Sequence, residues 1–318
     1  MKNILSTVGV SLVVISLSVL GFVFCPPLLS DLQLNTMLIL GIVCGVSVLY
    51  CFLVGEISGN NSQMDKLWSI LPEVYLWIIA IRSGMNPRVV VMAILATLWG
   101  IRLTFNFARK GAYSWKFWEG VEDYRWAYLR EHTILKNRVL FAFFDFFFIS
   151  IYQNVLILLT CLPGVAVMES SVAFGGMDFL AAGLMFAFLL LETVSDEQQW
   201  RFQSMKYKLL DQGKKLEELP EPYSYGFNTK GVWAFMRHPN YLGEQGVWFS
   251  LYLFTIQAGV NVYGIFNWSM IGCMMLILLF LGSSTFGENI TSGKYPLYKD
   301  YQKKVSKYLP FRKYQVTK

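Results

Sequence analysis

The sequence of 318 residues is poor in charge, because Asp, Glu, Lys and Arg together make up only 15% of it. An average soluble domain carries about 25% charged residues. Hydrophobic residues reach 55%, and they gather in runs of about 20, long enough to cross a hydrocarbon core of about 30 Å. The composition therefore excludes an ordinary soluble protein and predicts a polytopic membrane protein.

The scarcity of histidine and the absence of several sequence motifs exclude a number of enzyme and binding-site classes. The only histidines are His132 and His238, whereas the di-iron sites of membrane desaturases and hydroxylases need many imidazoles. The five cysteines show no CxxC spacing, so neither a zinc site nor a disulfide framework is indicated. Gly-rich nucleotide loops, Walker motifs and GxSxG elbows are also missing. We therefore expect no metal in this protein.

The apolar runs predict an all-α fold, a polytopic bundle of about eight transmembrane helices. We treat residues 1–318 as one integral membrane domain with two rough halves. The N-terminal half, residues 1–138, ends with the first basic loop, and the C-terminal half comprises residues 139–318. The predicted spans are Ile4–Phe24, Leu34–Gly55, Leu67–Ile81, Val89–Ala108, Val139–Leu162, Phe179–Val194, Tyr241–Ala258 and Phe266–Phe286.

Positive charge is distributed unevenly over the predicted loops. When the loops are assigned alternately, 24 of the 27 Lys and Arg residues lie on the side that holds both termini. This asymmetry predicts that both termini are cytoplasmic. Juxtamembrane basic residues ordinarily meet anionic lipid headgroups, so the net charge of +6 indicates membrane lipids and no nucleic acid as partners.

Polar residues at helical spacing inside a span are the best functional signal, because an isolated charge in the bilayer is expensive. Glu192, Asp196, Gln199 and Gln203 fall on one helix face, running from the sixth span toward the cytoplasm. The alternative is a helix end whose polar side chains simply reach water. Gly41 and Gly45 form a GxxxG pattern, which indicates close helix packing.

The sharpest local sequence is the octapeptide Arg-His-Pro-Asn-Tyr-Leu-Gly-Glu at 237–244, where a basic loop enters the seventh span. Pro239 suits a first helical turn, whose free N–H groups attract anions, and Arg237 adds positive charge. Asn240 and Glu244 share a face, with Tyr241 on the adjacent edge. A cation, an amide and a carboxylate within two turns suit a nucleotide cofactor. The alternative is a helix start at the membrane interface that carries polar side chains without binding a ligand.

Two further groups of residues are weaker candidates. Asp65 begins the third span beside Trp68, either as an acid of raised pKa in an apolar pocket or as an interfacial residue. Tyr298 and Tyr301 stand three residues apart in a lysine-rich tail, a pattern that amphipathic membrane anchors also show.

In this setting the octapeptide resembles the C-terminal signature of the steroid 5α-reductase superfamily. The chain is more similar still to the bacterial branch of that superfamily, a family of membrane proteins of unknown function. The residues that carry the likeness are Asp65, Trp68, Trp99-Gly100-Ile101-Arg102-Leu103, Glu122-Asp123-Tyr124-Arg125, Gln153, Leu162-Pro163, Asp196, Gln198, Phe202, Gly231-Val232-Trp233, the octapeptide, Glu288, Tyr298, Tyr301 and Pro310.

The resemblance implies a helical membrane fold that holds NADPH in a cytoplasm-facing cavity, with the phosphates toward Arg237 and the basic loops. It also implies the inner membrane of a bacterium as the location. Gln199 and Gln203 stand where reductases of this superfamily tend to offer basic residues. Asp65 is the candidate catalytic acid by position alone. The residues expected to bind the cofactor are Asp196, Gln199, Gln203, Arg237, His238, Asn240, Tyr241, Glu244, Tyr298 and Tyr301.

The expected function is reduction of a conjugated carbon–carbon double bond in a lipid-like substrate, such as a steroid, an enoyl chain or an isoprenoid. Asp65 and Glu244 are the residues expected to be catalytic. Membrane methyltransferases that act on isoprenylcysteine carboxyl groups or phospholipids use a similar octapeptide around S-adenosylmethionine, so a methyltransferase is the first alternative. A non-catalytic lipid-binding protein is the second. The identity of the substrate and the oligomeric state stay open.

Overall fold

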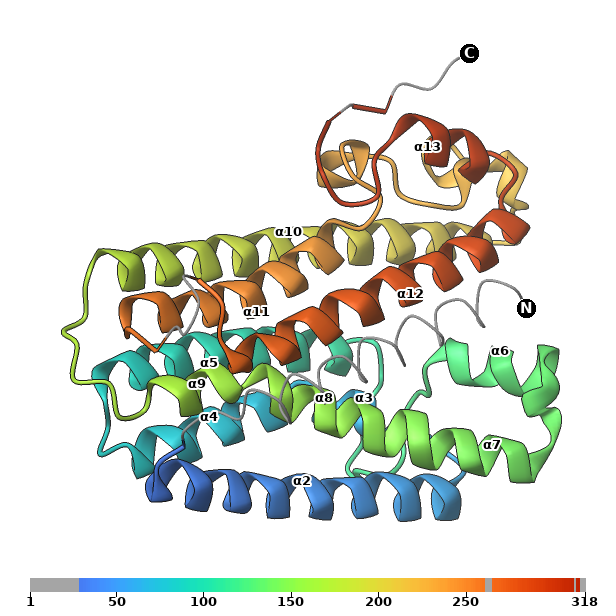
Figure 1. The fold of residues 1–318 in the computed structure, drawn as a ribbon. Coiled ribbons are helices and arrows are strands. Elements are labelled where there is room, and N and C mark those ends of the chain that lie inside the picture. The colour runs from blue at the N-terminus through green and yellow to red at the C-terminus, as the bar shows by residue number, and fades with distance from the viewer. Residues whose placement is uncertain (1–28, 261–264, 312, 315–318) are drawn as a thin grey trace. The chain divides into compact units, whose positions relative to one another are not determined.

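The computed structural model describes residues 29–260, 265–311 and 313–314. These residues form helices joined by loops of varied length, the longest of which connect α5 to α6 and α10 to α11 (Figure 1). Their one β-type pairing is an isolated parallel bridge between Met236 and Ser306. The predicted all-helical architecture is confirmed for this portion of the chain.

Five of the described helical segments are long and apolar enough to cross a membrane, and each matches a predicted span. Three are single helices, and the third and fifth in order are composite. They are α2 (Asp31–Ser58), α5 (Pro87–Ala108), the run Arg138–Val167, α10 (Gly176–Leu210) and the run Trp268–Lys294, which contains α12 (Ile271–Lys294). The chain is therefore a helical integral membrane protein.

The other three predicted spans have different outcomes. Leu67–Ile81 corresponds to α4 (Leu71–Arg82), a helix of 12 residues, and Tyr241–Ala258 corresponds to α11 (Pro239–Gln257), a helix of 19 residues. Both helices form, but neither combines the length and the apolar composition of the five segments named above. The prediction Ile4–Phe24 lies outside the described residues.

The run Arg138–Val167 is not a regular α-helix throughout. It consists of α7 (Arg138–Phe144), a π-helical stretch η2 (Asp145–Tyr152), α8 (Gln153–Thr160) and α9 (Leu162–Val167). Pro163 lies in the first turn of α9, where its missing N–H has no helical partner to lose.

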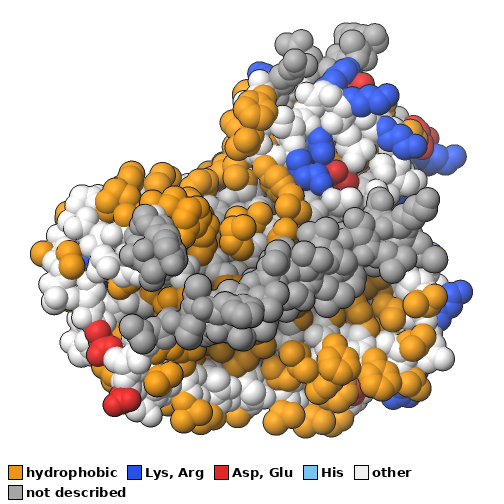
Figure 2. Space-filling view, in the orientation of Figure 1, with side chains coloured by type: hydrophobic (Ala, Val, Ile, Leu, Met, Phe, Trp, Pro, Cys, Tyr) orange, Lys and Arg blue, Asp and Glu red, His pale blue; other side chains and the backbone are white. Residues whose placement is uncertain are grey.

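Helix α2 has the side-chain distribution expected of a helix that faces lipid. Apart from Leu40, its buried face is made of small or polar residues, whereas most of its large apolar side chains point outward. The buried residues are Thr36, Leu40, Cys44, Ser47, Cys51 and Gly55, and the exposed ones include Leu38, Ile42, Val46, Leu49, Leu53 and Ile57. Orange side chains accordingly cover the region of α2 in Figure 2. A soluble helix would bury the apolar face instead.

The described residues divide into two compact units. The amino-terminal unit contains residues 29–182 and the described residues of 250–276, and the carboxyl-terminal unit contains 183–249 and the described residues from 277 onward. Helices α10, α11 and α12 contribute residues to both.

In the amino-terminal unit, α4 packs closely against α5 at Gly100. A Cβ atom at Gly100 would lie 2.6 Å from the carbonyl oxygen of Ser69, so only glycine fits there. The GxxxG prediction, in contrast, is wrong for the described residues. A Cβ atom at Gly41 or Gly45 would meet nothing within 4 Å, because both glycines lie on the exposed side of α2.

In the carboxyl-terminal unit, a short helix α13 (Tyr298–Lys304) anchors the tail. Its residues Tyr298 and Tyr301 pack with Tyr225, Phe227, Val305 and Tyr314 into a small aromatic core. Blue side chains gather over the region of α13 in Figure 2, where Lys299 and Lys303 are exposed. The tail therefore combines an apolar interior with a basic surface.

Candidate functional site

The polar face of α10 is formed as the sequence predicts. Glu192 is buried, and Asp196, Gln199 and Gln203 are partly buried on the following turns. The side-chain carbonyl oxygens of Gln199 and Gln203 are both buried, and neither has a hydrogen-bond partner among the described residues. A buried carbonyl without a donor costs about 1–3 kcal/mol. The face thus offers uncommitted acceptors to a ligand that carries donors.

Helix α11 approaches this face closely because of two glycines. A Cβ atom at Gly243 would lie 2.8 Å from Cβ of Glu192 and 3.0 Å from the carbonyl oxygen of Phe188. The ring of Phe188 occupies the space that a side chain at Gly246 would need. The glycine of the octapeptide is therefore a packing residue, and it holds the first turns of α11 against the polar face of α10.

This packing brings Asn240 to Asp196. The Asn240 Nδ2 atom lies 3.4 Å from Asp196 Oδ1, the long end of hydrogen-bond distance. Asn240 Oδ1 is buried and accepts nothing from the described residues. The four residues predicted to act together therefore lie on two helices in contact: Asp196, Gln199 and Gln203 on α10 and Asn240 on α11. No other described residue donates to the carboxamide oxygens of the two glutamines or of Asn240.

Glu244 lies one turn further into α11 and is 4% exposed. Its Oε1 atom accepts a hydrogen bond of 3.1 Å from the indole of Trp248, also one turn away on the same helix. A carboxylate held in this way is positioned by its own helix. Its role in catalysis stays a prediction.

Glu288 of α12 is the centre of the charged region of the site. Its carboxylate accepts from Arg237 Nε at 2.6 Å, from Arg237 Nη2 at 3.3 Å and from Gln302 Nε2 at 3.1 Å. His238 Nε2 lies 2.9 Å from Oε1, and because a carboxylate only accepts, this nitrogen donates. Four contacts therefore satisfy a carboxylate whose side chain is 5% exposed.

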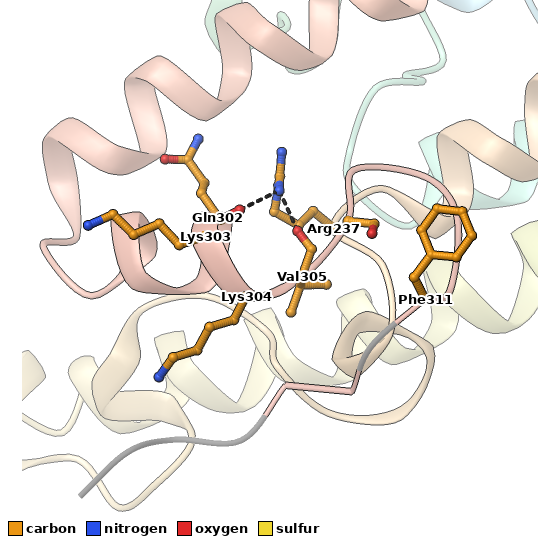
Figure 3. A pocket seen from close by; sticks show the side chains of 7 residues that line it. Arg237, Gln302, Lys303, Lys304, Val305 and Phe311 are labelled. Carbon is orange, nitrogen blue, oxygen red and sulfur yellow. Dashed lines mark hydrogen bonds between the residues drawn. The ribbon is translucent and has the colours of Figure 1, made fainter.

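Arg237 is committed to structure on its other side as well. Its Nη1 atom donates to the carbonyl oxygens of Gln302 and Val305, as the dashed lines in Figure 3 show. The backbone N–H groups of Arg237 and His238 donate to the carbonyl oxygens of Ser306 and Lys307. The arginine that the sequence predicts as a phosphate ligand thus also ties the octapeptide to the tail.

His238 lies between this charge cluster and two aromatic rings. It stacks on Tyr241 with ring centroids 5.2 Å apart and contacts Tyr308 at 6.2 Å. Burial lowers the pKa of His238, and nearby Arg237 and Lys307 lower it further, against the opposing effect of Glu288. His238 is consequently neutral at physiological pH and donates from Nε2.

Tyr298 and Tyr301, whose role in binding the cofactor stays a prediction, lie in the aromatic core of the tail. They are 6% and 1% exposed. The Tyr301 hydroxyl donates to the carbonyl oxygen of Trp233 and lies 3.3 Å from that of Met236. In the structure these tyrosines hold the segment that leads into the octapeptide.

A hollow of about 410 Å³ lies beside this segment (Figure 3). It is lined by Arg237, Gln302, Lys303, Lys304, Val305, Ser306 and Phe311, three of which are cations and none of which is an acid. Lys304 is paired with Asp300 at 2.9 Å, whereas Lys303 is exposed. The lining is suited to an anionic group.

Asp65 belongs to the amino-terminal unit, in the short helix α3 (Gln63–Leu67). Its Oδ2 atom accepts a hydrogen bond of 3.0 Å from the indole of Trp126, and Oδ1 lies 3.8 Å from Arg125. Burial and the neighbouring Asp123 raise the pKa of Asp65, and Arg125 only partly offsets them. The structure therefore supports the interpretation of Asp65 as an acid with a raised pKa.

Sequence reasoning missed the partners that organise the site. Gln302 was not singled out, yet it completes the shell around Glu288. Lys307 and Tyr308 were also overlooked, although both approach His238. The dense run of Lys and Tyr after α12 was the available signal, but a run of this kind does not indicate which members turn inward.

Comparison with known proteins gives a family without an assigned activity. The family described as "Protein of unknown function (DUF1295)" matches residues 51–305. The uncharacterized protein C594.04c of Schizosaccharomyces pombe is 33% identical over 285 residues, which cover 83% of this chain and 79% of that protein. No solved structure matches the chain. The predicted family of unknown function is confirmed, with a relative that is fungal where a bacterial branch was expected.

Proposed function

Because this chain belongs to the DUF1295 family, which is related to the steroid 5α-reductase-like superfamily, we propose that it is a membrane oxidoreductase. The proposed cofactor is NADPH, and the proposed substrate is a lipid-like molecule with a conjugated carbon–carbon double bond. The finer topology also belongs to this proposal: α4, α11 and the segment at 4–24 complete eight spans, both termini are cytoplasmic, and the cofactor cavity opens to that side.

The observation that carries the proposal is the set of unsatisfied acceptors on α10 and α11. Gln199, Gln203 and Asn240 each present a buried carboxamide oxygen without a partner among the described residues. Such a surface selects a ligand rich in O–H and N–H donors. Ribose hydroxyls, the amino group of adenine and the carboxamide of nicotinamide are donors of this kind, so a dinucleotide satisfies the site.

The basic hollow supports the same proposal from the anionic side of the cofactor. Arg237 and Lys303 line it without a carboxylate in the lining. Phosphate groups carry several strong acceptors and negative charge, which Lys and Arg complement. Since Arg237 also neutralises Glu288 and Lys304 is paired with Asp300, the positive charge available to a phosphate comes chiefly from Lys303.

When bound, the reduced nicotinamide supplies a hydride, which the β carbon of the conjugated substrate accepts. The electron pair of the double bond would then move toward the carbonyl oxygen, giving an enolate whose α carbon would take a proton from a water molecule. A protonated Asp65, favoured by its raised pKa, donates a hydrogen bond to that oxygen. Loss of such a donor typically costs about 3–4 kcal/mol in the barrier.

Glu244 is the second residue that we assign to the reaction. It is buried on α11, one turn beyond Asn240, and is fixed by Trp248. We expect Asp65→Asn and Glu244→Ala to abolish NADPH-dependent turnover while both variants still insert into the membrane. Unchanged turnover in both variants would reject these two assignments.

A methyltransferase is the second candidate, and one observation favours it. Arg237, the arginine of the octapeptide, donates to Glu288 and to two backbone carbonyl oxygens. Because this guanidinium is already paired, the site suits a nucleoside without phosphates, such as S-adenosylmethionine. Mass spectrometry of the small molecule released when the purified protein is denatured separates the two candidates. Release of NADPH supports the reductase, and release of S-adenosylmethionine supports the methyltransferase. Release of neither molecule supports a non-catalytic lipid-binding protein.

A further inference from the structure

The loop that follows α5 is closed and rigid. Its two ends meet where the Val121 N–H donates to the carbonyl oxygen of Gly111 at 2.9 Å. Gly120 has φ +117°, and a side chain there would collide with the carbonyl oxygen of Ala112. We call residues 111–121 the aromatic loop. A closed loop of this size, with its ends together, is a compact Ω-type loop.

Side chains from the turn around α3 hold the aromatic loop through its backbone. Four consecutive carbonyl oxygens, those of residues 117–120, each accept a hydrogen bond from this turn. The Lys66 Nζ atom donates to Phe117 at 2.7 Å and to Glu119 at 2.6 Å, Gln63 donates to Trp118 at 3.0 Å, and Asn60 donates to Gly120 at 3.0 Å. Lys66 is 1% exposed. A buried lysine thus fixes a loop that lies at the surface.

The aromatic loop turns its two tryptophans outward, whereas Tyr113 and Phe117 are partly buried. Trp115 is fully exposed, Trp118 is 49% exposed and Val121 is 62% exposed. Lys116 lies between the two tryptophans and is exposed as well. A tryptophan ring that faces water gains nothing from the burial that normally stabilises it. Because the four carbonyl contacts hold the backbone from behind, the loop keeps the positions of Trp115 and Trp118 at the surface.

We propose that the aromatic loop inserts Trp115 and Trp118 into the interfacial layer of the lipid bilayer. The loop begins three residues after Ala108, the last residue of a membrane-spanning helix, so it starts at the edge of the hydrocarbon core. Tryptophan favours this layer, where its ring is apolar and its N–H can meet water or headgroups. Lys116, between the two rings, is exposed and paired with Glu119 at 3.1 Å, so the loop also presents charged groups that suit the headgroup layer.

The test measures where the Trp115 ring lies. Full-length protein is reconstituted into vesicles of phosphatidylcholine and phosphatidylglycerol, with or without phosphatidylcholine brominated near the top of its acyl chains. The emission of Trp115 is the difference between wild type and Trp115→Phe, a change at an exposed position that leaves the core intact. Trp99→Phe gives a reference for a fully buried ring, which iodide in the water cannot reach.

We expect brominated lipid to reduce the Trp115 emission about twofold or more, and iodide to have little effect, as interfacial tryptophans behave. In Lys66→Met the loop loses its support, so the Trp115 emission should shift to the red and become sensitive to iodide. Trp115 emission that iodide quenches strongly and brominated lipid leaves unchanged would overturn the proposal, because the loop would then face water or a soluble partner. That outcome leaves the proposed reductase activity untouched.

Discussion

Arg237 and Glu288 form a buried ion pair, with Arg237 Nε 2.6 Å from Glu288 Oε1, although 51 positions separate them in the chain. The pair joins the start of α11 to α12. Gln302 and His238 complete the shell of the carboxylate. The octapeptide is therefore held in place from α12 and from the tail.

Removing the charge of Glu288 should destabilise the protein. In Glu288→Gln the buried guanidinium of Arg237 loses its counter-ion, which typically costs about 3 kcal/mol. We expect denaturant unfolding of the detergent-solubilised protein to show a loss of this size. The matched control is Glu197→Gln, because the Glu197–Arg201 pair is largely exposed and should change stability by less than about 1 kcal/mol. Equal effects of the two substitutions would contradict a central role for Glu288.

Because the pKa of His238 is lowered in the folded protein, we expect the stability of the protein to depend on pH. Burial lowers its pKa below the ordinary value of 6.5, so the unfolded chain takes up a proton at a higher pH than the folded protein does. Stability from this group is complete above pH 6.5 and is lost as the pH falls from there through the lowered pKa. Thermal unfolding followed from about pH 8 to about pH 5 should show the loss in wild type and a smaller loss in His238→Gln. A steeper loss in the variant would refute the assignment.

Much of the helical framework could be predicted from the sequence. Runs such as 34–55 and 89–108 are long, apolar and bounded by polar residues, and both became helices with ends within a few residues of the prediction. The stripe at 192, 196, 199 and 203 also formed one face, since helical spacing fixes which side chains align. These features depend on local periodicity alone.

Which glycines pack, in contrast, could not be predicted. Gly41 and Gly45 matched a packing pattern and face outward, whereas Gly243 and Gly246, without that spacing, contact α10. The partner of a helix face is set by long-range packing, which spacing within one helix does not encode. For the same reason the sequence did not indicate that Tyr298 and Tyr301 form the core of the tail.

Substitution of Gly243 tests the contact between α10 and α11. In Gly243→Ala the new methyl group would lie 2.8 Å from Cβ of Glu192, and overpacking of this kind costs about 1–3 kcal/mol. In Gly287→Ala of α12 the new methyl group meets no atom of the described residues within 4 Å, so this change should be neutral or stabilising, since alanine favours helix. The melting temperatures of the two variants should move in opposite directions or differ clearly. Similar melting temperatures would argue against the close approach.

Lys66 should control the mobility of the aromatic loop. In Lys66→Met the carbonyl oxygens of Phe117 and Glu119 lose their donor, so local opening becomes easier. Hydrogen exchange read by mass spectrometry should be faster across residues 111–121 in this variant. The control Lys116→Met removes an exposed lysine paired with Glu119 and should leave exchange nearly unchanged. Unaltered exchange in Lys66→Met would show that the loop does not depend on the buried lysine.

The central claim is that the facing polar sides of α10 and α11 bind a dinucleotide, and calorimetric titration of the full-length protein in detergent with NADPH tests it most directly. Asn240→Leu removes an acceptor and the contact to Asp196, while Asn289→Leu changes an exposed asparagine of α12. The account predicts that wild type and Asn289→Leu bind NADPH equally and that Asn240→Leu binds about tenfold or more weakly, the equivalent of one lost hydrogen bond. Absence of NADPH binding in wild type, or the same Kd in all three proteins, would contradict it.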